Sequence, residues 1–109
     1  MHFVVIARDK ADAGLRRRHR ADHLDYVTGY QDEIVYAGPL IEAGVIVGSL
    51  FVFDLPSRDA LDAYLAGDPY FAAPIFDRVE IFESRWIVPE QMPGFLREEA
   101  ARARDQAEG

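Results

Sequence analysis

The sequence contains no cysteine, and it has few positive charges and no long apolar run. The absence of thiols excludes disulfides, thiolate metal sites and cysteine-based catalysis. The sequence has 12 Lys and Arg residues against 19 Asp and Glu, which gives a net charge of −7. This charge argues against a nucleic-acid-binding protein, which needs a basic surface. No apolar run has the length of a membrane span, and charge follows the short apolar start too soon for a secretory signal. We therefore expect a cytoplasmic protein without nucleic-acid or membrane partners.

What the sequence does contain is enough apolar residues, half of 109, for one domain with a modest core. Apolar runs and turn residues predict strands over 2–8, 33–40, 45–55 and 78–88, with helices over 12–28 and after the cap residue Ser57. This β-α-β-β-α-β order predicts a ferredoxin-like α+β sandwich, with both helices on one face of a four-stranded antiparallel sheet. Residues 1–88 are the predicted domain, and residues 89–109 are a partly helical tail.

Three of the predicted strands, over 2–8, 45–55 and 78–88, are apolar on both faces, although the two helices cover only one face of the sheet. An antiparallel sheet with one wet face alternates apolar and polar residues instead. We expect a second copy of the chain to cover the open face, which gives a homodimer with its sheets face to face. The tail is the alternative cover, but it offers only Met92, Phe95 and Leu96.

A histidine and an aspartate form the predicted catalytic pair. His23 lies on the first predicted helix, and imidazole both accepts and donates a proton near neutral pH. Asp68 follows the second predicted helix on the same sheet face, and a carboxylate bonded to imidazole fixes its tautomer. The alternative is structural, because a lone helix histidine is usually a packing residue and Asp68 before Pro69 is typical of a helix N-cap.

Four further residues are the predicted substrate contacts. Ser49 follows Gly48 on the longest predicted strand, and at Gly48 the backbone can approach a ligand. We expect the Ser49 hydroxyl to donate a hydrogen bond to the ligand or to Asp68; the alternative is that Ser49 has no role beyond the strand. Arg20 ends the cluster Arg16–Arg20, which is either a solvated helix face or a local anion site. Tyr70 completes the set. A metal is not expected, because His19 and His23 have metal-ligand spacing but lack a third ligand.

Taken together, five short motifs resemble the YCII-related (YciI-like) family. They are, in order, Arg20-Ala21-Asp22-His23-Leu24, Ala37-Gly38-Pro39-Leu40, Gly48-Ser49, Asp68-Pro69-Tyr70-Phe71, and Val79-Glu80-Ile81-Phe82 with Trp86. The resemblance covers residues 2–88. It implies a ferredoxin-like fold, dimers of the α+β barrel type, an active-site His and Asp at His23 and Asp68, and Ser49 beside them. Gly67, where the family commonly has an acidic residue, and Arg85, where it commonly has proline, depart from the pattern.

The resemblance also implies chemistry, because relatives occur beside aromatic degradation and the fold is shared with muconolactone isomerases and small cofactor-free monooxygenases. We expect a small cofactor-free isomerase or lyase that uses His23 and Asp68 for proton transfer on a small polar or aromatic metabolite. The alternatives are a dimeric module that binds a small molecule without turnover, and a purely structural His23–Asp68 pair.

Overall fold

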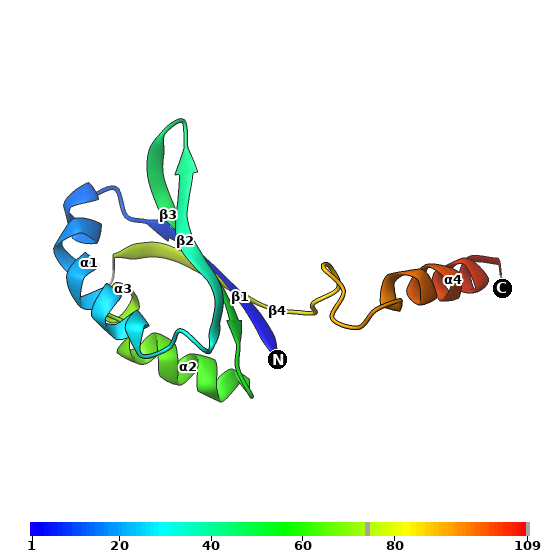
Figure 1. The fold of residues 1–109 in the computed structure, drawn as a ribbon. Coiled ribbons are helices and arrows are strands. Elements are labelled where there is room, and N and C mark those ends of the chain that lie inside the picture. Colours follow the sequence, from blue (N-terminus) through cyan, green and yellow to red (C-terminus); the bar gives the residue numbers. More distant parts are fainter. Residues whose placement is uncertain (74, 109) are drawn as a thin grey trace.

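The computed structural model describes residues 1–73 and 75–108, so that Gly109 of the predicted tail lies outside the described residues. Figure 1 shows a twisted sheet with helices packed on one face and a C-terminal helix that projects away from it. The elements in chain order are β1 (His2–Asp9), α1 (Ala13–Thr28), β2 (Ile34–Glu42), β3 (Val45–Asp54), α2 (Arg58–Gly67), α3 (Pro69–Ala72), β4 (Phe76–Ser84) and α4 (Phe95–Glu108).

The sheet has the strand order β2-β3-β1-β4, with every neighbouring pair antiparallel. Strands β1 and β2 are separated by β3, so each helix crosses over one strand, as the ferredoxin-like topology requires. The predicted α+β fold is therefore confirmed. In the middle of the sheet, Val5 pairs with Phe51 of β3 and with Ile81 of β4.

Short polar side chains begin the helices where the sequence predicts. Asp12 accepts a hydrogen bond from the Gly14 N–H, Ser57 accepts one from Ala60, and Asp68 accepts one from Tyr70. Each of these side chains satisfies a backbone donor that the first helical turn leaves free. The cap at Asp68 also fixes the place of its carboxylate between α2 and α3.

The core lies between the sheet and the helices. Its main cluster consists of Phe3, Val5, Phe51, Phe53, Leu55, Leu61 and Tyr64, and a smaller one consists of Ala7, Tyr70, Ile75 and Phe76. Burying each large apolar side chain contributes about 1.5–3 kcal/mol. Gly48 of β3 permits close strand packing next to these clusters, because a Cβ there would lie 2.1 Å from the carbonyl oxygen of Ala7.

The last strand begins two residues earlier and ends four residues earlier than the predicted range 78–88. It ends at Ser84 because that residue pairs with His2, where β1 begins, and no partner backbone lies beyond. Its start is shifted by the bulge that pairs Asp9 with Phe76. Trp86 therefore lies outside the strand, where its indole N–H donates to the carbonyl oxygen of Pro89 at 2.7 Å.

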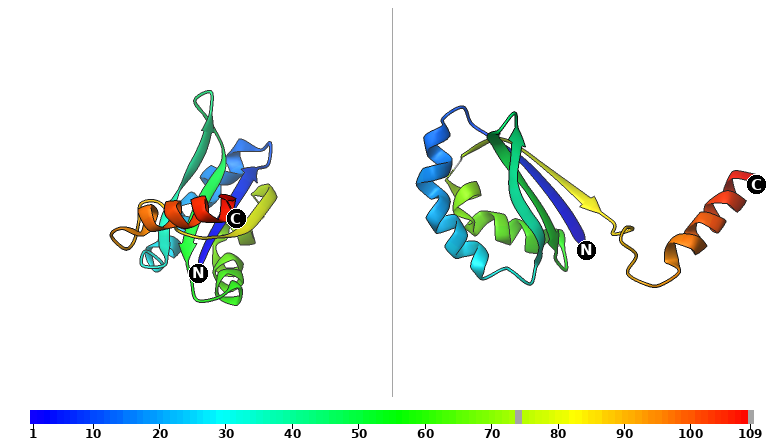
Figure 2. Two further views of the ribbon diagram at one scale, coloured as in Figure 1. Left: turned by 90° about the vertical axis from the view of Figure 1, so that its right-hand side faces the viewer. Right: turned by 45° about the horizontal axis from the view of Figure 1, so that its top comes forward.

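The second face of the sheet carries apolar side chains, and no helix of the described residues packs on it. Its strands place Val4, Ile6, Leu50, Val52, Tyr36 and Phe82 there, and Tyr36 and Phe82 remain 58% and 49% exposed. Helix α4 lies away from this face in Figure 1 and in the right-hand view of Figure 2. Within residues 1–73 and 75–108, no helix is long and apolar enough to cross a membrane.

Candidate active site

His23 and Asp68 are in direct contact, although 45 residues separate them in the sequence. The Nδ1 atom of His23, on α1, lies 2.8 Å from an Asp68 carboxylate oxygen at the junction of α2 and α3. Asp68 is completely buried and His23 is 9% exposed. The geometry therefore places the histidine between the buried carboxylate and the surface.

The Asp68 carboxylate accepts three hydrogen bonds. Its Oδ2 accepts from the Tyr64 hydroxyl at 2.7 Å, and its Oδ1 accepts from the Tyr70 backbone N–H at 2.9 Å and from His23. Because the carboxylate only accepts, this arrangement assigns a proton to Nδ1 of His23. Every fully buried side-chain nitrogen or oxygen in the described part of the chain has a partner. Among these residues the Nε2 atom of His23 has no hydrogen-bond partner, so it is not fully buried.

Aromatic rings hold the imidazole in place. The Tyr70 ring stacks on it with a centroid distance of 3.8 Å and an interplanar angle of 7°. The Phe51 ring meets it edge-on at 6.0 Å. Burial raises the pKa of the Tyr70 phenol above its ordinary value, while the charges of Arg16 and Arg20 act in the opposite direction. Tyr70 thus remains a neutral, flat wall beside His23.

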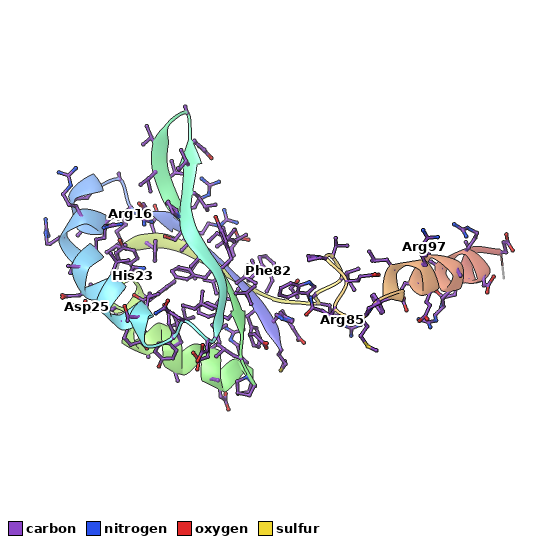
Figure 3. All side chains as sticks on the ribbon, in the orientation of Figure 1. Arg16, His23, Asp25, Phe82, Arg85 and Arg97 are labelled. Carbon is purple, nitrogen blue, oxygen red and sulfur yellow. The ribbon has the colours of Figure 1, made fainter. Side chains whose placement is uncertain are left out.

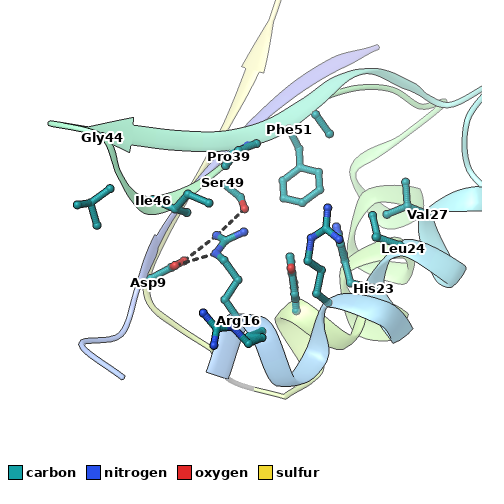
Figure 4. A pocket seen from close by; sticks show the side chains of 16 residues that line it. Asp9, Arg16, His23, Leu24, Val27, Pro39, Gly44, Ile46, Ser49 and Phe51 are labelled. Carbon is teal, nitrogen blue, oxygen red and sulfur yellow. Dashed lines mark hydrogen bonds and ion pairs between the residues drawn. The ribbon is translucent and has the colours of Figure 1, made fainter. Parts of the chain in front are cut away.

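A second polar cluster joins β1, α1 and β3. The Arg16 guanidinium donates two hydrogen bonds of 2.8 Å to the Asp9 carboxylate and a third, also of 2.8 Å, to Ser49 Oγ (Figure 4). It also lies 5.1 Å from the centre of the Tyr70 ring. Burial alone lowers the pKa of Arg16, but the hydrogen bonds and charge of Asp9 outweigh it and raise that pKa. Arg16 is therefore a fixed cation that holds Ser49 in place.

Both clusters open into one cavity of about 770 Å³ between α1 and the β2–β3 hairpin (Figure 4). Arg16 and His23 project from α1 toward the sheet, whereas Asp25 projects away from it (Figure 3). The lining residues are Asp9, Arg16, Arg17, Arg20, His23, Leu24, Val27, Ala37, Gly38, Pro39, Gly44, Val45, Ile46, Ser49, Phe51 and Tyr70. The cavity therefore combines apolar walls with charged and polar side chains.

The structure brings most of the predicted site residues to this cavity. His23, Ser49, Arg20 and Tyr70 line it, and Asp68 lies directly behind His23. Gly48 is not among the lining residues, and its lack of a side chain is explained by the Ala7 carbonyl. The hydroxyl of Ser49 is bound by Arg16; no bond to Asp68 is found among residues 1–73 and 75–108.

The sequence analysis did not predict Asp9 as a residue of the site. It named Arg16 only as part of a basic cluster and did not predict its contacts with Asp9 and Ser49. Arg16, Arg20, His23 and Val27 follow the spacing i, i+4, i+7, i+11, which places them on one helix face. That stripe is the signal that identifies Arg16. In the described ranges no three His, Asp or Glu side chains form a group able to hold a metal ion.

Fold and cavity define a small ferredoxin-like domain of the α+β barrel type, with a buried His–Asp contact at the cavity wall. The model of the YCII-related domain matches residues 1–85, so the chain belongs to the YCII-related family.

Solved structures with the same fold include two named enzymes. One is 5-chloro-2-hydroxyhydroquinone dehydrochlorinase from Burkholderia phenoliruptrix AC1100, in complex with 2,5-dihydroxybenzoquinone; it is 23% identical, with a TM-score of 0.73 over 78% of this chain and 94% of that one. The other is muconolactone isomerase, 21% identical, with a TM-score of 0.55 over 84% of this chain and 96% of that one. Comparison with curated proteins found no match. At these identities the likeness establishes the fold.

Proposed function

We propose that this protein is a small cofactor-free enzyme, isomerase- or lyase-like, in which His23 transfers a proton to and from a small polar or aromatic metabolite. The observation that carries the proposal is the position of His23. Its Nδ1 is bound by the fully buried Asp68, whereas its Nε2 has no partner among residues 1–73 and 75–108. The imidazole also lines a cavity large enough for a small ring compound. A base needs this arrangement of one oriented nitrogen and one open nitrogen.

In the proposed reaction, Nε2 of His23 takes a proton from a carbon of the substrate, and Asp68 stabilises the resulting imidazolium. Returning the proton to a different carbon completes an isomerisation, whereas departure of a leaving group completes an elimination. Both outcomes need only one oriented imidazole.

Charge that develops on a substrate oxygen needs a donor, and Ser49 is the candidate. Its oxygen accepts a hydrogen bond from Arg16, so its own O–H proton is available to donate into the cavity. We assign Arg20 and Tyr70 to substrate binding, since both line the same cavity as His23 and Ser49.

The similar structures support this reaction class. One is a dehydrochlorinase that holds a dihydroxybenzoquinone, and another is a muconolactone isomerase. Hydroxylated aromatic rings and unsaturated lactones are therefore the compounds with which to begin a search for substrate.

We also propose that the enzyme is a homodimer whose two copies meet through the open sheet face. The half-exposed apolar side chains there, with Tyr36 and Phe82 at its sides, support a second copy as the cover, because such a patch is costly in water. Residues 1–88 would form the domain that dimerises, with the segment from Pro89 onward as an appended tail.

Sedimentation of the variant Phe82→Glu tests the proposed dimer, since the proposal requires that variant to be monomeric.

The test of catalysis uses three proteins in deuterated water, namely wild type, His23→Gln and His19→Gln. His19 lies on the same helix but does not line the cavity, which makes it the matched control. Each protein is mixed with the hydroxylated aromatic compounds and unsaturated lactones in turn, and proton NMR detects both deuterium uptake into these compounds and new products. We expect His23→Gln to lower the rate by about 10²-fold or more and His19→Gln to leave it unchanged.

Equal rates in wild type and His23→Gln would contradict the proposal. A ligand that binds wild type without exchange or turnover would favour the non-catalytic binding module instead.

A further inference from the structure

We infer that the ligand of this cavity is a planar monoanion, and that Arg20, with Arg17 beside it, recognises its negative charge. The inference deepens the proposed function, since it names the class of substrate that His23 would act on. It rests on how the three cavity arginines are occupied, on the balance of charge around the cavity, and on the shape of its walls.

The three arginines that line the cavity have different partners. Arg16 forms an ion pair with the Asp9 carboxylate through two hydrogen bonds and donates a third to the Ser49 hydroxyl. Arg17 and Arg20 make no hydrogen bond or ion pair with any residue in the ranges 1–73 and 75–108. The Arg20 charge nevertheless acts on the phenol of Tyr70, which stacks on His23. Arg20 is thus a free cation directed at the wall that holds the candidate base.

The charges around the cavity leave a positive excess. Two carboxylates, Asp9 in the cavity lining and the buried Asp68 behind His23, stand against the three guanidinium groups of Arg16, Arg17 and Arg20. One positive charge therefore remains, in a protein whose net charge is −7. A local positive site in an acidic protein attracts a small anion specifically, because the surrounding surface repels it. The excess of one charge matches a monoanion.

The walls favour a flat, largely apolar ligand body. The stacked rings of His23 and Tyr70 give one planar surface, and the Phe51 ring stands edge-on to it. Six of the 13 other lining residues are apolar, namely Leu24, Val27, Ala37, Pro39, Val45 and Ile46, and two more are glycines. A sugar or polyol would require many more polar partners than this lining supplies. A ring bearing one anionic oxygen group satisfies the arginines and the apolar walls together.

The test compares two flat probes of nearly the same shape, benzoate, which is a monoanion, and benzamide, which is neutral. Titration calorimetry measures both with wild type, Arg20→Gln, Arg17→Gln and Arg18→Gln. Arg18 is the matched control, since it belongs to the same cluster but does not line the cavity. We expect wild type to prefer benzoate by about tenfold or more, because a charge-assisted hydrogen bond is roughly twice as strong as a neutral one.

Arg20→Gln should abolish this preference, Arg17→Gln should reduce it, and Arg18→Gln should leave it intact. The preference should also weaken as salt is raised. Equal affinity of wild type for the two probes, no measurable benzoate binding, or an unchanged preference in Arg20→Gln would each overturn the inference.

The variant His23→Gln separates this inference from the proposed catalytic role. It leaves both free arginines in place, so it should still prefer benzoate. A retained preference together with normal turnover in His23→Gln would refute the catalytic proposal and leave the anion site standing. Loss of the benzoate preference in Arg20→Gln, together with loss of turnover in His23→Gln, would support both the anion site and the catalytic proposal.

Discussion

Replacing Asp68 by Asn tests how the structure fixes the proton on His23. The Oδ1 position accepts from both the Tyr70 backbone N–H and His23, and a backbone N–H cannot accept in return. The amide of an asparagine must therefore place its oxygen there and its NH₂ group toward the Tyr64 hydroxyl, which can turn to accept. We expect the Nδ1–H tautomer of His23 to persist in Asp68→Asn.

The cost in stability follows from the same three hydrogen bonds. Replacing a charged acceptor by a neutral one weakens each by about 1 kcal/mol, and the removed burial cost of the charge offsets part of this. We expect Asp68→Asn to lose about 1–3 kcal/mol of unfolding free energy. Asp68→Ala leaves three donors without an acceptor, at about 1–3 kcal/mol each, which approaches the whole stability of a small domain.

Urea denaturation measures both losses, and nitrogen NMR of the labelled imidazole reports the tautomer. Two results would refute the reasoning: a proton on Nε2 of the neutral His23 in wild type, or equal stability losses in the Asn and Ala variants. Where a substrate is in hand, Asp68→Asn should also lower turnover, because no negative charge then stabilises the imidazolium.

Two further predictions concern the tyrosines around the site. Burial, followed by the hydrogen bond to Asp68, raises the pKa of Tyr64 above its ordinary value of 10.0. Above about pH 10 the unfolded chain releases this proton and the folded chain keeps it, so Tyr64 should lower the free energy of unfolding by about 1.4 kcal/mol per pH unit. Alkaline denaturation of Tyr64→Phe should therefore show a free energy of unfolding that falls less steeply with pH, by the slope of one proton. Gly67→Ala should destabilise the wild-type protein, because a Cβ there would lie 2.5 Å from the Tyr26 hydroxyl. In the background of Tyr26→Ala the same change should stabilise the protein, since alanine is a better helix former than glycine by up to about 1 kcal/mol. Thermal melts of wild type, the two single variants and the double variant measure both effects.

The fold was predictable from the sequence because its signals are local. Asp12, Ser57 and Asp68 are N-caps that the sequence alone identifies, and the apolar runs define the strands to within a few residues. The end of β4 was not predictable, because it depends on where its partner β1 begins.

The site divides in the same way. His23 and Asp68 were found by residue type and by the family resemblance. The Arg16–Asp9–Ser49 cluster was missed, because three elements meet there and only the register of β1 against β3 places Asp9 and Ser49 near one another. A basic cluster on a helix is usually solvated, and the sequence does not tell which of its arginines is bound by a carboxylate.

The departure from the family pattern at Gly67 has a packing explanation. Gly67 does not line the cavity, so its effect on cavity charge is indirect at most. A side chain there would overlap the Tyr26 ring, and the Tyr26 hydroxyl donates to the backbone carbonyl of Tyr64 at 2.8 Å. The side chain of Tyr64 in turn donates to Asp68. Glycine at position 67 therefore makes room for Tyr26, which supports the last turn of α2, where Tyr64 binds Asp68. We expect substitutions at Gly67 and Tyr26 to occur together.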